Sequence, residues 1–283
     1  GYDAWSLDNN RKTQSDNPGS DDQDTLAITA KGSWQLNDNQ SLQLIGSRSE
    51  SDLYYGYDLD WINPDFCVTY LCTGYTYTAS TESFDRQRDK NTLDLRLLGG
   101  SQSLNAGEWQ YVFGLYANQS KEKLNYSLSG ISHYQAERYA SYAQLDIAAT
   151  DSLTLSAGLR VEKFKDDYQG VNAYTSDNSD TLWSGELSAK VQLADNSMAY
   201  ITIARGHKPG GTNTDASAKQ PLMSPDFQVF TQNKLSFDSE ILLNKEIGFK
   251  TSLLDRRLAI NAALFHADRD NAQLENWMWD GMA

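Results

Sequence analysis

The chain has 283 residues and a formal net charge of −14, from 24 Lys and Arg against 38 Asp and Glu. This acidity argues against a nucleic-acid partner, because binding to phosphates requires a basic surface. A mean hydropathy of −0.61, with no run of 18 apolar residues, excludes helical membrane spans.

Strict alternation of apolar and polar residues, not a helical period, dominates the sequence. From Thr25 to Leu36 the even positions are apolar or glycine and the odd positions are mostly polar. Such alternation is typical of strands with one apolar and one wet face. Short turn-forming segments separate pairs of these strands, which predicts five hairpin blocks at 25–51, 91–120, 139–164, 181–206 and 241–267.

The lengths within and between the blocks predict where the sheet lies. Half a block leaves a strand of about 12 residues, and a tilted transmembrane strand needs about 9 to 11. The stretches between blocks are longer and unequal: 52–90, 121–138, 165–180 and 207–240. Short turns at one end and long loops at the other are typical of an outer-membrane barrel, not of a soluble sandwich. We therefore predict an all-β fold, an antiparallel up-and-down transmembrane β-barrel.

The charge distribution agrees with this interpretation. The five blocks hold 11 basic and 11 acidic residues, whereas the loops and ends hold 13 and 27. Block residues such as Lys31, Arg96 and Glu162 can face a wet lumen. The acidic loops argue weakly against capturing highly anionic ligands by charge attraction. Of 32 aromatic residues, 23 are Trp or Tyr, which prefer the boundary between apolar and wet surroundings.

The sequence predicts neither an enzyme nor a bound metal or cofactor. Asp16, Asp21, Asp22 and Asp24 have the composition of a calcium loop, but their spacing fits no EF-hand and favours a solvated acidic loop. The three histidines are scattered. No Ser/His/Asp motif or paired-carboxylate arrangement can be placed among the many loop carboxylates.

Candidate substrate-binding residues lie in the stretch 52–90. Its aromatic and acidic side chains suit stacking on a sugar or holding the hydroxyls of a polar ligand; a packed loop with interfacial aromatics is the alternative. These residues are Tyr55, Tyr57, Asp58, Asp60 and Trp61. An extracellular location predicts a disulfide between Cys67 and Cys72, with free thiols or a metal pair as alternatives. In the entropic model, a disulfide that closes so small a ring stabilises the folded loop by about 2 kcal/mol, because it restrains the unfolded chain.

Two segments resemble a known family. Residues 200–213 read Y-I-T-I-A-R-G-H-K-P-G-G-T-N and resemble the Y-x-x-x-A-R-G-x-K-P-G-G-x-N segment of TonB-dependent outer-membrane receptors. Residues 240–265 are similar to a hairpin of the same family, and residues 57–61 resemble a loop in one branch of it. Arg205 and Lys208, within the first segment, are further candidates for substrate binding.

The resemblance implies a 22-stranded barrel closed by an N-terminal plug. About ten strands with both ends on the long-loop side indicate a central segment of that barrel, without the plug and the TonB box. Two unpaired strand edges would then be exposed. We therefore expect the isolated polypeptide not to give a stable monomer in detergent.

The functional hypothesis is active uptake of a scarce, large substrate across the outer membrane of a Gram-negative bacterium. The substrate would be a ferric siderophore, another chelate or an oligosaccharide. The expected partners are outer-membrane lipid and, through the plug, the TonB energy-transducing complex. The alternatives are a ten-stranded outer-membrane protease and a soluble carbohydrate-binding β-protein. The protease would need periplasmic termini, which the hairpin polarity disfavours.

Overall fold

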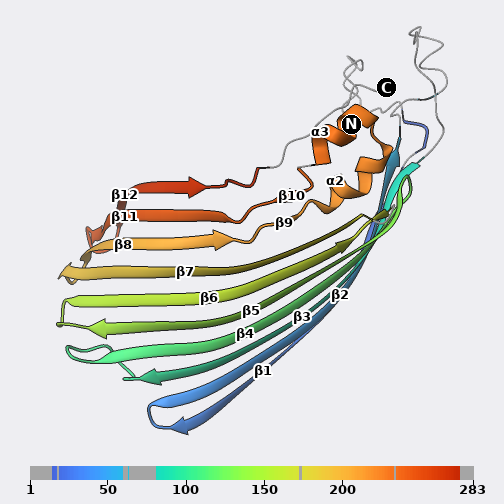
Figure 1. Cartoon of the computed structure of the whole chain (residues 1–283). Helices are drawn as coiled ribbons and strands as arrows, with labels where there is room; N and C mark the ends of the chain where they lie inside the picture. Colours follow the sequence, from blue (N-terminus) through green and yellow to red (C-terminus); the bar gives the residue numbers. More distant parts are fainter. Residues whose placement is uncertain are drawn as a thin grey trace.

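The structure is a computed structural model that describes residues 15–17, 19–59, 63, 81–171, 174–232 and 234–274. Ten long strands form one antiparallel sheet in chain order. They are β1 (Asp21–Asn37), β2 (Gln40–Asp58), β3 (Thr81–Gly100), β4 (Trp109–Tyr126), β5 (Gly130–Ala148), β6 (Leu153–Gln169), β7 (Thr175–Ala194), β8 (Ser197–Lys208), β11 (Glu240–Leu253) and β12 (Leu258–Asp270). Figure 1 shows the sheet curved like part of a barrel wall, with the five tight hairpin turns at one end.

The two faces of the sheet differ because polar and apolar residues alternate along its strands. One face exposes large apolar side chains: Ile28 is 62% exposed, Leu187 63% and Leu264 74%. We call this the outer face. The opposite face carries polar and charged side chains and is hollowed, and we call it the inner face. An apolar outside and a polar inside are what a barrel wall in lipid requires.

The strands are longer than the sequence blocks, at 12 to 20 residues. Much of 121–138 and 165–180, predicted as loops, is strand: β4 continues to Tyr126, β5 begins at Gly130 and β6 continues to Gln169. A hydrogen-bond ladder needs only paired backbone groups, so it continues where the outward residues become polar, as at Lys163 and Lys165. The strands thus project beyond the apolar band.

The connection between β8 and β11 contains further structure. It holds β9 (Gly211–Thr212), α2 (Thr214–Lys219), the 3₁₀ turn η2 (Gln220–Leu222), α3 (Pro225–Gln232) and β10 (Ser236–Phe237), and we call it the 209–239 segment. Helix α2 begins where Asn213 Oδ1 accepts a hydrogen bond from the Ala216 N–H at 3.1 Å. In Figure 1 its helices lie at the end of the sheet away from the tight turns. No helix among the described residues is long and apolar enough to cross a bilayer.

Candidate functional site

Four aromatic rings meet on the inner face, at the end of the sheet away from the tight turns. The register places Tyr55 opposite Phe84 and Phe84 opposite Tyr126, so three adjacent strands each contribute a ring. Phe84 and Tyr126 stack with centroids 4.7 Å apart and planes 10° from parallel. The ring centroids of Tyr55 and Tyr57 lie 6.4 and 6.5 Å from that of Phe84. We call these four residues the aromatic cluster, which offers flat apolar surface to a stacked ligand.

A buried carboxylate, Glu82, lies beside the aromatic cluster. Its Oε1 accepts a hydrogen bond from the Tyr126 hydroxyl at 2.6 Å and lies 3.3 Å from Lys219 Nζ. That ammonium also lies 5.3 and 5.5 Å from the ring centroids of Phe84 and Tyr126. Burial, together with the hydrogen bond to Glu82, raises the pKa of the Tyr126 hydroxyl, so it remains a donor at neutral pH. Lys219 thus ties helix α2 to the cluster.

Next to the aromatic cluster, toward the tight turns, the inner face is basic. Every second residue of this part of β3 is basic and points to the inner face: Arg86, Arg88 and Lys90. Arg138 on β5 lies on the same face. We call these four residues the basic stripe. Glu122 Oε1 lies 3.4 Å from Arg86 Nε, and its Oε2 lies 2.6 Å from Arg88 Nε. The residues opposite Lys90 on the two neighbouring strands are serines. Glu122 therefore offsets only part of the positive charge.

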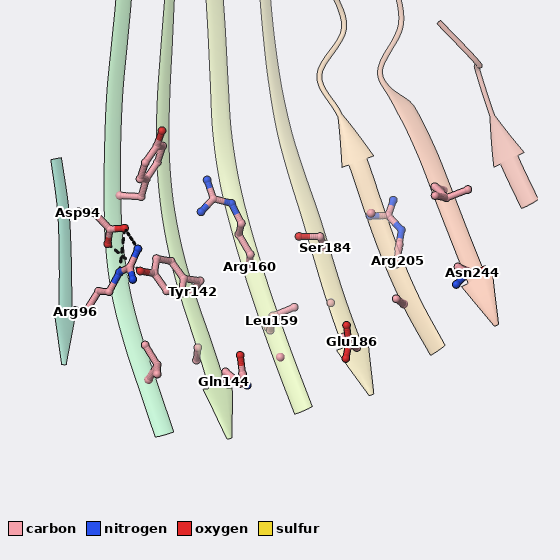
Figure 2. A pocket seen from close by; sticks show the side chains of 18 residues that line it. Asp94, Arg96, Tyr142, Gln144, Leu159, Arg160, Ser184, Glu186, Arg205 and Asn244 are labelled. Carbon is pink, nitrogen blue, oxygen red and sulfur yellow. Dashed lines mark hydrogen bonds and ion pairs between the residues drawn. The ribbon is translucent and has the colours of Figure 1, made fainter. Parts of the chain in front are cut away.

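Farther toward the tight turns, the inner face forms a hollow of about 860 Å³. Figure 2 shows Asp94 and Arg96 on β3 beside Tyr142 on β5, with Arg160 on β6. Asp94 Oδ2 lies 2.6 Å from Arg96 Nη2, and its Oδ1 accepts a hydrogen bond from Tyr142 at 2.8 Å. Arg160 Nη2 pairs with Glu162 Oε2 at 2.5 Å. Asp94 and Glu162 thus each pair with an arginine of the wall, whereas Lys90 of the basic stripe has only serines opposite it.

The 209–239 segment is held to the inner face at its base. Asp166, on β6 and 4% exposed, accepts hydrogen bonds from Asn178 Nδ2 at 2.8 Å and from the Thr212 N–H at 3.3 Å. Ser239 donates to Asp180 Oδ2 at 2.5 Å. These contacts and the Lys219 ion pair fix the segment beside the aromatic cluster, so a ligand that reaches the cluster must also meet this segment.

Asp166 should make stability depend on pH. Burial raises the pKa of its carboxyl above the usual range, although the hydrogen bonds from Asn178 and Thr212 oppose the rise. The stability it contributes is therefore present below about pH 4, its unfolded pKa, and is lost as pH rises through the higher folded value. Asp166→Asn should match the native protein in acid and be the more stable of the two at neutral pH, measured by thermal unfolding of the full-length protein.

Two variants control this measurement. Asp166→Ala removes the acceptors for both hydrogen bonds and should lower the free energy of unfolding by about 1 to 3 kcal/mol at every pH. Asp167→Asn, an exposed neighbour on the opposite face, should leave the pH profile unchanged. An Asp166→Asn profile parallel to the native one would contradict the assignment.

The family described as "TonB dependent receptor-like, beta-barrel" matches residues 1–278. The chain belongs to this family. The predicted relationship and fold class are therefore confirmed: the ten-stranded sheet is part of a TonB-dependent receptor barrel.

Individual relatives agree. The pesticin receptor of Yersinia enterocolitica is 29% identical over 178 residues, which are 58% of this chain and 24% of that protein. The catecholate siderophore receptor Fiu of Escherichia coli K12 is 26% identical over 165 residues, 50% of this chain and 21% of Fiu. The crystal structure of the ferric yersiniabactin uptake receptor FyuA from Yersinia pestis has a TM-score of 0.67 at 20% identity, over 89% of this chain and 37% of FyuA. The matched region thus spans about a quarter of these curated relatives.

The residues predicted from the sequence to bind substrate do not lie together in one site. Tyr55 and Tyr57 lie in the aromatic cluster. Asp58 follows Tyr57 along β2, so its side chain leaves the strand on the side opposite the aromatic cluster. It is 2% exposed. No described residue donates a hydrogen bond to its carboxylate. Lys208 is exposed at the end of β8, opposite Glu240. Asp60, Trp61, Cys67 and Cys72 lie outside the described residues, so their predicted roles stay predictions.

Arg205 does not join the aromatic cluster. It alternates with residues of the inner face and shares the outer face with Ile201 and Ile203, which are 51% and 47% exposed. Its guanidinium carbon lies 4.1 Å from the centroid of the Trp183 ring, on the same face. Arg205 is also among the residues that line the inner-face hollow (Figure 2), so its predicted role in substrate binding stays a prediction.

Sequence reasoning missed most of the residues that this receptor wall brings together. Phe84, Glu82 and the β3 part of the basic stripe lie in 52–90, which was interpreted as loop, and Tyr126 lies in 121–138. The alternation of Phe84, Arg86, Arg88 and Lys90 at every second position was a signal for one face of a strand. No sequence signal linked Lys219 to Glu82, because only the tertiary fold brings them together.

Proposed function

We propose that this chain forms part of the wall of an outer-membrane receptor that takes up an anionic ferric chelate, such as a siderophore. The observation that carries the proposal is the basic stripe directly beside the aromatic cluster on the inner face. Rings can stack on the planar groups of a chelate, and Lys90, which has only serines opposite it, can pair with its anionic oxygens. The acidic balance of the whole chain does not oppose this, because the local charge at the cluster is positive.

The relatives support a transport role. Their printed names describe receptors for pesticin and catecholate siderophores and an uptake receptor for ferric yersiniabactin. We propose that this receptor likewise transports its ligand and does not hydrolyse it, that it lies in the outer membrane of a Gram-negative bacterium, and that the TonB complex supplies the energy through a plug. An oligosaccharide is the competing substrate class, since aromatic rings also stack on sugars.

Iron uptake by cells tests this function. The full-length protein should be expressed in a strain that lacks its own siderophore receptors, with and without a functional TonB complex. Cells should accumulate iron from anionic ferric chelates only when TonB is present. Neutral ferric hydroxamates should be poorer substrates. Uptake of oligosaccharides but not of iron would replace the proposed substrate class, and uptake independent of TonB would overturn the mechanism.

A further inference from the structure

A cation from the 209–239 segment occupies the aromatic cluster. Lys219 Nζ lies 5.3 and 5.5 Å from the ring centroids of Phe84 and Tyr126, and 3.3 Å from Glu82 Oε1. Aromatic rings around a cation are the usual way in which proteins recognise alkylammonium groups. The Lys219 side chain is 33% exposed, and Tyr55, also in the cluster, is 40% exposed. A ligand can therefore reach the rings beside the lysine.

Glu82 makes this position selective for a positive charge. It is 7% exposed, so its carboxylate is largely removed from water. Its Oε1 accepts a hydrogen bond from the Tyr126 hydroxyl at 2.6 Å and also faces the Lys219 ammonium. A buried carboxylate that loses its cationic partner is strongly destabilising. An anionic group of a ligand therefore cannot replace the lysine here, whereas an ammonium group can.

The position of Lys219 distinguishes it from other cations that lie over rings. Arg160 also lies over two rings and pairs with a buried carboxylate, but Arg160 and its partner Glu162 are both on β6, 2.5 Å apart. The wall itself holds that pair. Lys234 and Lys250 each lie over one ring and are exposed. Lys219 instead reaches the wall from helix α2, so a ligand can exchange with its ammonium without disturbing a strand.

We propose that the aromatic cluster and Glu82 bind an ammonium group of the ligand, which takes the place of the Lys219 ammonium. This rests on the proposed function and narrows its substrate class to anionic ferric chelates that also carry a protonated amine. The flexible four-carbon stem of lysine lets its ammonium turn away while α2 stays in place. Tyr55 and Tyr57 remain available to stack on planar groups.

The distance along β3 constrains the shape of such a ligand. A rise of about 3.3 Å per residue puts the Cα atoms of Glu82 and Arg88 about 20 Å apart. The ammonium group must therefore lie on an arm that extends away from the anionic groups around the iron.

Two matched probes test the proposal on the purified full-length protein. One is a ferric tris-catecholate with a primary amine on an alkyl arm, and the other is its N-acetylated form; quenching of tryptophan fluorescence measures both affinities. The amine form should bind about tenfold more tightly, because the neutral acetylated arm cannot pair with Glu82 or with the ring faces. General attraction to the basic stripe would favour the acetylated form instead, since that form is the more anionic.

Removing the carboxylate charge controls this comparison. Glu82→Gln keeps an acceptor for the Tyr126 hydroxyl and removes the negative charge. The preference for the amine form should then fall to about twofold or less, the contribution of the ring faces at an exposed site.

Chemical rescue tests the ammonium site without an iron chelate. Lys219→Ala leaves Glu82 without its cation and should lower the melting temperature of the full-length protein. Millimolar n-propylammonium, which matches the deleted end of the side chain, should restore most of the loss, whereas potassium at the same concentration should not. The double variant Lys219→Ala, Glu82→Gln should show no rescue. Nor should Lys234→Ala, which removes a lysine over the exposed ring of Phe230.

The two measurements separate this proposal from the proposed function. Equal affinity of the native protein for both probes, a preference unchanged in Glu82→Gln, or no rescue of Lys219→Ala by propylammonium would each overturn the ammonium site. If Lys219→Ala does not fold, the comparison of probes on the native protein decides. Failure of both probes to bind the native protein would reject the proposed function, and propylammonium rescue would then decide the ammonium site alone.

Discussion

Replacing Arg88 and Lys90 together by Gln is expected to weaken binding of an anionic ferric chelate by at least about 30-fold. Each charge-assisted hydrogen bond to a bound anion contributes about 1.5 to 3 kcal/mol, and the Arg88 contribution is reduced by its pairing with Glu122 at 2.6 Å. Lys90 faces serines and has no such compensation. Quenching of tryptophan fluorescence in the full-length protein, titrated with a ferric catecholate, measures the change.

A cation elsewhere on the inner face provides the control. Lys190→Gln on β7 removes one positive charge near the tight turns, far from the aromatic cluster along the wall. Its effect should be within about twofold, because exposed charges beyond a Debye length are screened at physiological salt. A comparable loss in Lys190→Gln would indicate that only the overall charge matters. An unchanged affinity in the double variant would remove the basic stripe from the site.

Replacing Tyr126 by Ala should be the most destabilising single change in the site. The residue is 2% exposed, stacks on Phe84 and donates to Glu82, so truncation leaves a cavity and a buried carboxylate without one donor. We expect the free energy of unfolding to fall by about 3 to 5 kcal/mol. Tyr126→Phe keeps the ring and should cost about 1 to 3 kcal/mol through the lost hydrogen bond. Denaturant unfolding of the full-length protein in lipid vesicles measures both.

An exposed tyrosine on the neighbouring strand provides the control for loss of a buried ring. Tyr139 lies on the outer face of β5 and is 50% exposed. Tyr139→Ala should change the free energy of unfolding by about 1 kcal/mol or less, because it removes an exposed ring and one hydrogen bond to Glu137 of 3.3 Å. If Tyr126→Ala costs no more than Tyr139→Ala, the aromatic cluster does not stabilise this end of the wall.

The fold was predictable because the side-chain period of a strand is visible in one sequence. Alternation such as that from Thr25 to Leu36 identifies both faces before any pairing is known. The strand ends were less predictable. Beyond the apolar band both faces become polar, so the extensions of β4, β5, β6 and β7 have a loop-like composition although their backbones pair.

The candidate site was only partly predictable, for a related reason. Tyr55 and Tyr57 were identified from their composition, but their partners Phe84 and Tyr126 come from strands whose register cannot be obtained without the fold. Arg205 lies within a motif typical of the family, which does not say which face its side chain occupies. Its alternation with Ala204 and Gly206, in phase with Ile201 and Ile203, indicates the outer face.

The location of bound iron is the most direct test of the central claim that the inner face holds an anionic chelate at the aromatic cluster. Crystals of the full-length receptor soaked with a ferric catecholate would give the iron position by anomalous scattering. The structure predicts an iron peak between the aromatic cluster and the basic stripe, beside Phe84 and Arg88. A peak in the hollow around Asp94 and Arg160, or none on the inner face, would contradict that claim.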